Sequence, residues 1–397
     1  MYTILINNIL SHFYVLNKKQ SLILYSSCYM VSILIALFYD SFRFRVKLGN
    51  KKIDTIFNLI CCMIISLPVA NVLGYRGTST GYDTANYVMN YLNYGRENFS
   101  WSKMLATDPG YYAITKISYI LWNGNKHGGL WLMTFLTIWF VAISLSKVRG
   151  KGALPIGLFT FYMIFGLNMG DQSRQLLSLS IMMLGIDKLL NGQTKRFIFF
   201  VIIATTVHLS SILSLVLLLL NYFDKIENNY LKIHINNVKI KLSYVFLILS
   251  CLGLLIIMLF SISIIYRYIP SHYKYVLDAA ITQGHLGLKW VLDTMPIIIM
   301  MILSNWWAKS KKIVDRGPWY TIVFRISGYS SYFLMRIMYI PYYVGIFTVS
   351  NNFTKIKNKN YKMLFCLISI VLLIAYFYLD NFILDEHNMM NYSVLCG

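Results

Sequence analysis

The stretch ALPIGLFTFYMIFGLNMGDQSRQLLSLSIMMLGIDKLL (residues 153–190) places the polar group DQSRQ between two apolar runs. Both runs are apolar enough for a bilayer, so the polar group predicts the mouth of a membrane helix. That face must contact protein or water, because an arginine at the membrane midplane costs about 2.5–3.5 kcal/mol on insertion scales. A helix that begins near residue 170 would carry four polar side chains on one face: Asp171, Arg174, Gln175 and Ser178.

Two interpretations of Arg174 follow from this placement. In the first, the arginine snorkels to the membrane surface beside an aspartate that caps the helix. In the second, the guanidinium lies beside a helix N-terminus and forms an anion site, which suits phosphate. The residues alone leave both interpretations open.

The composition of the whole chain agrees with a membrane location. Hydrophobic residues make up 57% of the sequence, charged residues 13%, and the mean hydropathy is +0.57. Soluble domains carry about 25% charged residues. The sequence therefore predicts an all-α polytopic membrane protein, because apolar runs near 18 residues suffice for a hydrocarbon core of about 30 Å. These runs are 22–39, 53–73, 129–146, 153–169, 242–266 and 363–379.

The formal net charge of +21 would suggest a nucleic-acid partner in a soluble chain. In a membrane protein, the positive-inside rule explains it, and we expect no nucleic acid. Most basic residues fall in loops that this rule places in the cytoplasm: 42–52, 147–151, 188–196, 225–241, 309–316 and 355–362. Both termini and the loop 74–128 are then predicted to lie outside the cytoplasm.

The apolar run 197–223 lies between two of these basic loops. A single crossing would place four lysines of the next loop outside, so we predict two short segments that break near His208. Broken helices of this kind are tolerated where they line a cavity. The prediction is then about twelve membrane segments in a single domain, 1–397, with 74–128 as the main external loop and carrier of amphipathic helices.

The sequence shows no nucleotide-binding, zinc-protease or serine-hydrolase motif, and no cysteine spacing typical of a disulfide framework or a metal site. We therefore expect neither a cofactor nor a metal. If the protein is an enzyme, the energy for its reaction must arrive with the substrate.

The predicted external loop begins with GYRGTSTGYDTANYVMNYLNYG (74–95). Asp83 is a candidate helix N-cap, and Tyr87 and Tyr91 belong to a polar and aromatic stripe at helical spacing. This stripe is typical of an interfacial helix with a tyrosine belt. It would equally suit a sugar-binding surface around Arg76 and Asp83.

Three further places carry ionisable residues. His208 lies in ATTVHLSS (204–211), where it is either an interhelical hydrogen-bonding residue or a general base. Arg336 lies in the apolar segment 325–343 and needs an anionic ligand, tyrosine hydroxyls or carbonyls as partners. Asp108, in DPGYYAITKI (108–117), is predicted to cap a helix on the outer face.

Taken in order, four motifs resemble the EpsG-like branch of the Wzy-type polysaccharide polymerases. They are R-G-x3-G-x-D-x3-Y (76–87), the acid-P-G-Y element (108–111), D-Q-S-R-Q (171–175) and A-x3-H-x-S (204–210). The resemblance covers roughly residues 20–350. Similar proteins usually have Glu at the position of Asp108 and Asn at that of Asp171.

The resemblance implies a GT-C-like membrane glycosyltransferase that joins polyprenyl-diphosphate-linked repeat units of O-antigen or exopolysaccharide at the bacterial inner membrane. Membrane lipid is then a partner, and a chain-length regulator and a flippase could be others. By matched position it implicates Arg76, Gly81, Asp83, Tyr87, Asp108, Arg174, Gln175, His208 and Arg336.

Together with the residue chemistry, the resemblance gives each candidate a role. Arg76, Arg174 and Arg336 would bind the diphosphate, and His208 or Asp83 would be the base. Sugar-binding residues would be Tyr87, Tyr91, Gln175 and Asp108. Two alternatives remain: an O-antigen ligase with the same chemistry, and a flippase that transports lipid-linked oligosaccharide.

Overall fold

The structure, a computed structural model, describes residues 15–45, 51–218, 230–232, 239–241, 288–308, 339–385 and 387–393. This part of the chain is helical apart from one short antiparallel pair, β1 (Tyr230–Lys232) and β2 (Lys239–Lys241). The first helices are α2 (Lys18–Arg43), α3 (Lys51–Gly74), α4 (Thr84–Arg96), α5 (Trp101–Ala106), α6 (Pro109–Leu121), α7 (Gly128–Ser146) and α8 (Ala153–Phe165). The others are α9 (Asn168–Asp171), α10 (Ser173–Leu190), α11 (Thr194–Val207), the 3₁₀ helix η1 (Leu209–Leu215), α15 (Leu288–Ala308), α18 (Tyr339–Lys355), α19 (Lys359–Phe377) and the π-helix η4 (Tyr378–Ile383).

Four helices of the described part are long and apolar enough to cross a membrane: α2, α3, α7 and α19 with its continuation through η4. This finding supports the predicted all-α membrane protein. The predicted run 242–266 lies outside the described residues, and α8, α15 and η1 are shorter apolar helices. The figure of about twelve crossings therefore stays a prediction.

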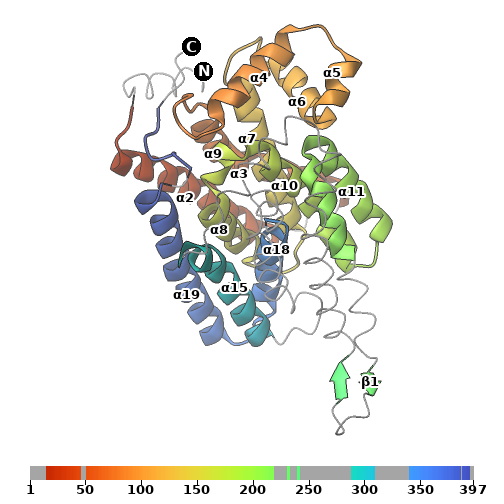
Figure 1. Cartoon of the computed structure of the whole chain (residues 1–397). Coiled ribbons are helices and arrows are strands. Elements are labelled where there is room, and N and C mark those ends of the chain that lie inside the picture. Colours follow the sequence, from red (N-terminus) through yellow and green to blue (C-terminus); the bar gives the residue numbers. More distant parts are fainter. Residues whose placement is uncertain are drawn as a thin grey trace.

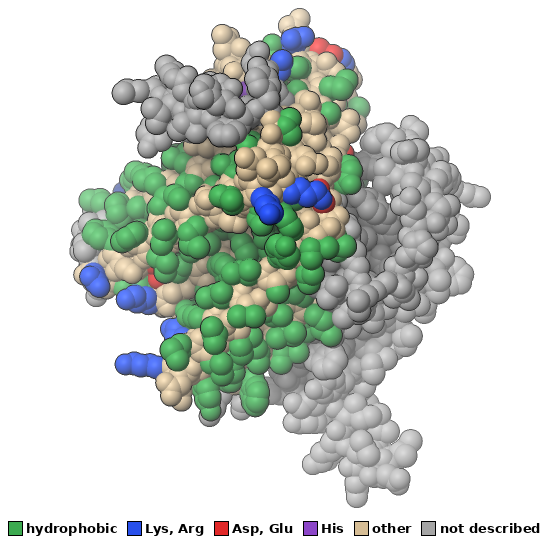
Figure 2. Space-filling model, turned by 90° about the vertical axis from the view of Figure 1, so that its left-hand side faces the viewer, with side chains coloured by type: hydrophobic (Ala, Val, Ile, Leu, Met, Phe, Trp, Pro, Cys, Tyr) green, Lys and Arg blue, Asp and Glu red, His purple; other side chains and the backbone are tan. Residues whose placement is uncertain are grey.

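Helix α7 lies at the centre of the bundle, where it packs against α3, α10 and α8 (Figure 1). In its most apolar window 72% of the residues are buried, compared with 33% in α2 and α3 and 28% in α19. The outward sides of these last three helices carry exposed apolar side chains such as Phe38, Ile56 and Val371. Figure 2 shows the resulting broad apolar surface on the side of α2 and α19.

Helix α2 shows why the sequence packs in this way. An Asn17–Gln20 capping box starts it. Its buried stripe contains small and hydroxyl-bearing residues, and Ser32 donates to the carbonyl of Ile65 at 2.7 Å and lies 2.6 Å from the Tyr162 hydroxyl. Buried polar contacts combined with an apolar outer face are typical of a helix surrounded by lipid.

The predicted break at His208 is present. Helix α11 ends at Val207, His208 has extended backbone angles (φ −154°, ψ 119°), and η1 follows. Gly185 of α10 lies against Phe197 and Phe200 of α11, which runs antiparallel to α10. Both helices rise by about 1.5 Å per residue. Ser178, which precedes Gly185 by seven residues, would therefore lie level with roughly residue 206 if α11 continued straight.

Ser178, however, bonds Ser211 at 2.6 Å. Residue 211 thus lies at the level of α10 where residue 206 is expected. The chain therefore turns at His208 instead of continuing along the axis of α11. The rest of the predicted return crossing lies outside the described residues.

Helices α4, α5 and α6 form a cap at one end of the bundle (Figure 1). The two ends of the described chain lie at the same end: Val15 pairs with Ser393 in an isolated β-bridge, and the N–H of Gly77 donates to the Ser393 carbonyl at 2.6 Å. The structure thus places residues 15 and 393 on the side of the 74–128 segment, as the predicted topology requires.

Candidate functional site

The polar group at 171–175 does not lie on one continuous helix. Helix α9 ends at Asp171, Gln172 leaves helical geometry (φ −115°, ψ 39°), and α10 begins at Ser173. The expectation that Asp171 and Arg174 share a helix face is therefore wrong. Partners from distant segments hold the interruption in place, and helical periodicity in the local sequence cannot reveal them.

Arg76 is one of these partners. It is fully buried, and its guanidinium donates to the carbonyls of Leu73 and Gly170 (the latter at 2.7 Å) and to the Thr84 hydroxyl at 2.9 Å. Burial lowers its pKa to about 10, so the group stays charged at neutral pH. These bonds tie the 73–84 loop to the junction of α9 and α10. The predicted diphosphate role of Arg76 finds no support in this geometry, because the protein itself occupies the guanidinium.

Asp171 organises the opposite side of the same junction. Its Oδ1 accepts the main-chain N–H of Asp83 at 3.2 Å, and its carbonyl accepts the Tyr87 hydroxyl at 3.2 Å. Its Oδ2 lies 3.4 Å from Nδ1 of His387. Asp83 stands at the predicted N-cap position of α4 but makes no side-chain capping bond; its carboxylate accepts from Asn86 at 3.4 Å.

Arg174 begins the second half of the site. Its Nη1 lies 3.4 Å from Oδ2 of Asp108, which stands at the N-cap of α6. Its Cζ lies 4.8 Å from the ring centre of Tyr111 and 5.9 Å from that of Tyr87. The side chain is 30% exposed, unlike Arg76. The predicted sites on α4, α6 and α10 therefore converge around an accessible cation.

The Tyr111 hydroxyl adds a polar atom to this cluster. It is buried and has no hydrogen-bond partner among the described residues, and the same is true of the Gln172 side-chain oxygen. Burial raises the pKa of Tyr111, while the nearby Arg174 opposes that rise. A buried hydroxyl without a partner costs roughly 1–3 kcal/mol, so a polar ligand beside Arg174 would relieve a real deficit.

His208 is held differently from a free base. Its Nδ1 accepts the N–H of Ser210 at 3.3 Å and lies 2.8 Å from the Ser210 hydroxyl, so the ring caps η1. This bond assigns the neutral tautomer with the proton on Nε2. The lone pair that a base would use is thus occupied. In the structure, His208 caps η1. Gly110 of α6 packs on Thr206, which sets the break close to Asp108 and Arg174.

All four predicted sugar-binding residues are buried, and Tyr87 (6% exposed) and Asp108 (9%) differ from the other two by their contact with Arg174. Tyr91 is 2% exposed, donates to the carbonyl of Ser118 at 3.4 Å and packs on Gly129. Gln175 is 3% exposed. Tyr91 thus holds α4 against α6 and α7, away from Arg174. Tyr87 and Asp108 do lie at Arg174, whereas Arg336 lies outside the described residues.

Sequence reasoning missed His387, Tyr111 and Gln172. Tyr111 stands in the motif that was singled out for Asp108 and could have been found by its position beside that residue. His387 carries no periodicity or motif, and only the fold brings it to Asp171, which is 216 positions away. Within the described chain, no group of three His, Cys, Asp or Glu side chains is placed to hold a metal.

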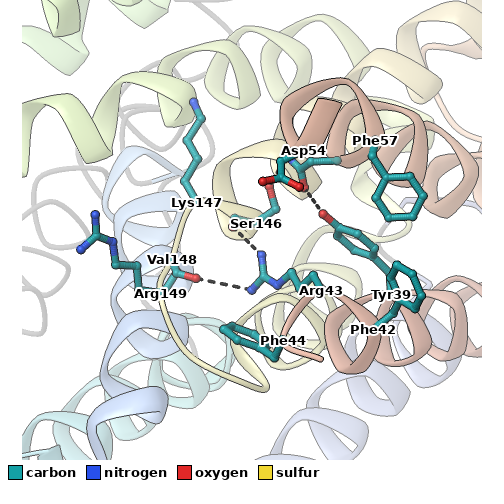
Figure 3. A pocket seen from close by; sticks show the side chains of 11 residues that line it. Tyr39, Phe42, Arg43, Phe44, Asp54, Phe57, Ser146, Lys147, Val148 and Arg149 are labelled. Atoms are coloured by element: carbon teal, nitrogen blue, oxygen red, sulfur yellow. Dashed lines mark hydrogen bonds between the residues drawn. The ribbon is translucent and has the colours of Figure 1, made fainter. Parts of the chain in front are cut away.

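A cavity of about 300 Å³ lies away from Arg174, where α2, α3 and the α7–α8 loop meet. There Arg43 pairs with Asp40 at 2.8 Å and donates to the carbonyls of Ser146 and Val148, as expected for a cation at a helix C-terminus. Lys147 and Arg149 extend away from Arg43 (Figure 3). Because these cations do not converge, this cavity is a weaker candidate than the Arg174 site.

Comparison with known proteins gives one match. A family model described as the EpsG family matches residues 59–394. The match covers most of the chain and every residue of the Arg174 site, and it leaves out α2 and the first part of α3. No curated protein and no solved structure gives a significant match.

Proposed function

Because the chain belongs to the EpsG family, we propose that it is a membrane glycosyltransferase of the polysaccharide-polymerase type. Its substrates are repeat units of O-antigen or exopolysaccharide linked to polyprenyl diphosphate. The observation that carries this proposal is the surroundings of Arg174: a partly exposed arginine at the start of α10, beside two tyrosine rings and a buried hydroxyl that has no partner among the described residues.

The reaction suits such a site. A hydroxyl of one repeat unit attacks the anomeric carbon of the growing chain, and the bond from that carbon to the diphosphate oxygen breaks. The leaving diphosphate keeps the electron pair, so negative charge grows on it in the transition state. A guanidinium fork near a helix N-terminus stabilises that charge without further chemistry.

We assign Arg174 to the diphosphate, with Tyr111 as a hydroxyl donor beside it. Tyr87 and Asp108 contact the same arginine and are the sugar-contacting candidates. His208, whose Nδ1 accepts the capping bond, serves better as a hydrogen-bond donor than as a base. Arg336 stays a proposed second diphosphate residue, and Arg76 is reassigned to holding the junction together.

The membrane arrangement belongs to the same proposal. About twelve crossings in a GT-C-like fold would place the Arg174 site and both termini on the periplasmic side of the bacterial inner membrane. Supporting this orientation, three basic residues, Arg43, Lys147 and Arg149, lie at the same end of the bundle, around the cavity of Figure 3 where α2 ends and α3 begins. The Arg174 site lies at the other end of α3, near Leu73 and Arg76. The site would therefore lie on the opposite side of the membrane from these basic residues.

The flippase alternative fits this geometry less well. A transporter is expected to hold its substrate near the middle of the membrane, on broken helices of related halves. Here the described polar cluster gathers at the end of α3 and the starts of α4, α6 and α10. The ligase alternative shares the proposed chemistry and is separated by experiment.

Deletion of the gene in a bacterium that carries it tests the proposal. For a polymerase, the surface lipid of the deletion strain should carry single repeat units and no ladder of longer chains. A ligase mutant would leave the lipid without any repeat unit. An unchanged ladder would contradict both activities.

A further inference from the structure

Residues 385 and 387–393, which follow η4, are built into the site. Its Asn388 carbonyl accepts the N–H of Gly81 at 2.8 Å, and Met389 packs on Gly170 and Gly81. The Tyr25 hydroxyl donates to the Met389 carbonyl at 2.9 Å. These bonds fix the segment to the junction of α9 and α10, so the side chain that points from it toward Asp171 is fixed as well.

That side chain is His387. It is 11% exposed, and its Nδ1 lies 3.4 Å from Oδ2 of Asp171. Among the described residues its hydrogen-bond partner is Asp171, which it meets through Nδ1, and the side chain is partly exposed. An imidazole whose Nδ1–H faces a carboxylate carries its free lone pair on Nε2.

This arrangement is the reverse of the one at His208. There, Nδ1 is used to cap η1 and the proton is assigned to Nε2. At His387, Nδ1 is turned to a carboxylate and the lone pair is left on Nε2. Of the two histidines, only His387 presents an accepting nitrogen with an aspartate behind it, which is the pairing that orients a general base.

The position of His387 also fits the reaction. Asp171 is three residues from Arg174, and the two are bridged by Tyr87, which donates to the Asp171 carbonyl while its ring lies 5.9 Å from the Arg174 Cζ. Tyr87 therefore contacts both Asp171 and Arg174, and this places the His387–Asp171 pair and the arginine at the same junction.

We propose that His387 is the general base of the transfer and that Asp171 is its positioning residue; this inference rests on the proposed function. The acceptor hydroxyl loses its proton to Nε2 of His387 as its oxygen bonds to the anomeric carbon. The bond between that carbon and the diphosphate oxygen breaks, and the leaving group takes the electron pair. Water then removes the proton from the imidazolium.

The test uses the full-length protein in nanodiscs, with lipid-linked repeat units isolated from the deletion strain. The variant is His387→Asn, because the Asn amide can still donate to Asp171 but offers no nitrogen in place of Nε2. Two acceptors are compared: the natural repeat unit, and azide. Azide attacks the anomeric carbon without losing a proton, so it has no need of a base.

We expect His387→Asn to slow transfer to the natural acceptor by about 10²–10⁴-fold and to leave azide transfer within about threefold of the wild type. Asp171→Asn should slow only the natural transfer, by a smaller factor. A matched control is Lys103→Gln on α5, which changes an exposed ion pair with Glu97 and should affect neither acceptor.

The outcomes separate cleanly. Wild-type rates with both acceptors in His387→Asn would overturn the assignment while the proposed function stands. Loss of both transfers, in a variant that melts at the wild-type temperature, would assign His387 to substrate binding instead of proton transfer and overturn it too. If the wild-type protein transfers to neither acceptor, the proposed function itself fails.

Discussion

Arg76 and Arg174 carry the same guanidinium and lie on the two sides of one helix junction, yet their surroundings give them opposite roles. Arg76 is fully buried and donates to carbonyls and hydroxyls of the protein. Arg174 is 30% exposed, with one carboxylate and two rings beside it. The motifs predicted both arginines to be diphosphate ligands. Residue type and spacing cannot show which guanidinium the folded protein itself will hydrogen-bond.

Arg174 should be sensitive to the shape of its side chain as well as its charge. We expect Arg174→Ala to lower transfer by about 10²–10³-fold, as for loss of one preorganised donor. Arg174→Lys should recover little, because lysine lacks the bidentate fork. Chain-length ladders, together with immunoblots for protein level, measure this. Wild-type chain lengths at normal expression would assign Arg174 to structure.

Arg76 should act on stability instead. Arg76→Met keeps much of the side-chain volume but leaves the carbonyls of Leu73 and Gly170 without their donor. Each buried group that loses its partner costs about 1–3 kcal/mol. Melting of the purified variant in detergent should therefore occur at a clearly lower temperature. A variant that melts normally but has lost transfer would return Arg76 to the diphosphate site.

His208 should tolerate a change that preserves its cap. Asparagine is among the preferred N-cap residues, so His208→Asn can still accept the Ser210 N–H. We expect this variant to retain transfer within about tenfold of wild type, the lower limit of a typical base effect being about 10²-fold. A loss of 10²-fold or more with normal folding would show that His208 takes part in the transfer beyond its capping bond.

At the scale of elements, the break at His208 was predictable and the break at Gln172 was not. Basic residues on both sides of 197–223 conflict with a single crossing, and this conflict can be read from the sequence. Around Gln172 the local pattern is continuously helical. The interruption there depends on Arg76 and Tyr87, which reach the carbonyls of Gly170 and Asp171 from more than 80 positions away.

The turn at His208 leads to a topology prediction. If the chain crosses back after η1, the four lysines at 225, 232, 239 and 241 lie in the cytoplasm. Reporter fusions at Asn236, a position outside the described residues, should then be fluorescent with a green fluorescent protein and inactive with alkaline phosphatase. A fusion at Asn125, between α6 and α7, should give the opposite result. Strong phosphatase activity at Asn236 would contradict the return crossing.

At the scale of the whole molecule, composition predicted the class of protein well. The apolar runs 22–39, 53–73, 129–146 and 363–379 all became helices long enough to span a membrane. What composition could not predict is which of these helices is central. Helix α7 is buried because α3, α8 and α10 surround it, and that arrangement depends on long-range contacts that hydropathy does not encode.

The same limit applies to the site. The motifs identified Asp83, Tyr87, Asp108 and Arg174, which the fold does gather at one junction. His387 could not be found in this way, because it is supplied by the returning C-terminal segment. A residue supplied from 216 positions away along the chain can be found only in the folded structure.

The central claim is that this chain joins lipid-linked repeat units, and the most direct measurement is their fate with the purified protein. Full-length protein in nanodiscs would be mixed with repeat units isolated from the deletion strain, and the products separated by length. We predict a ladder of chains at multiples of one repeat unit, with polyprenyl diphosphate released for each bond formed. Repeat units that stay unjoined in the presence of folded protein would contradict the claim.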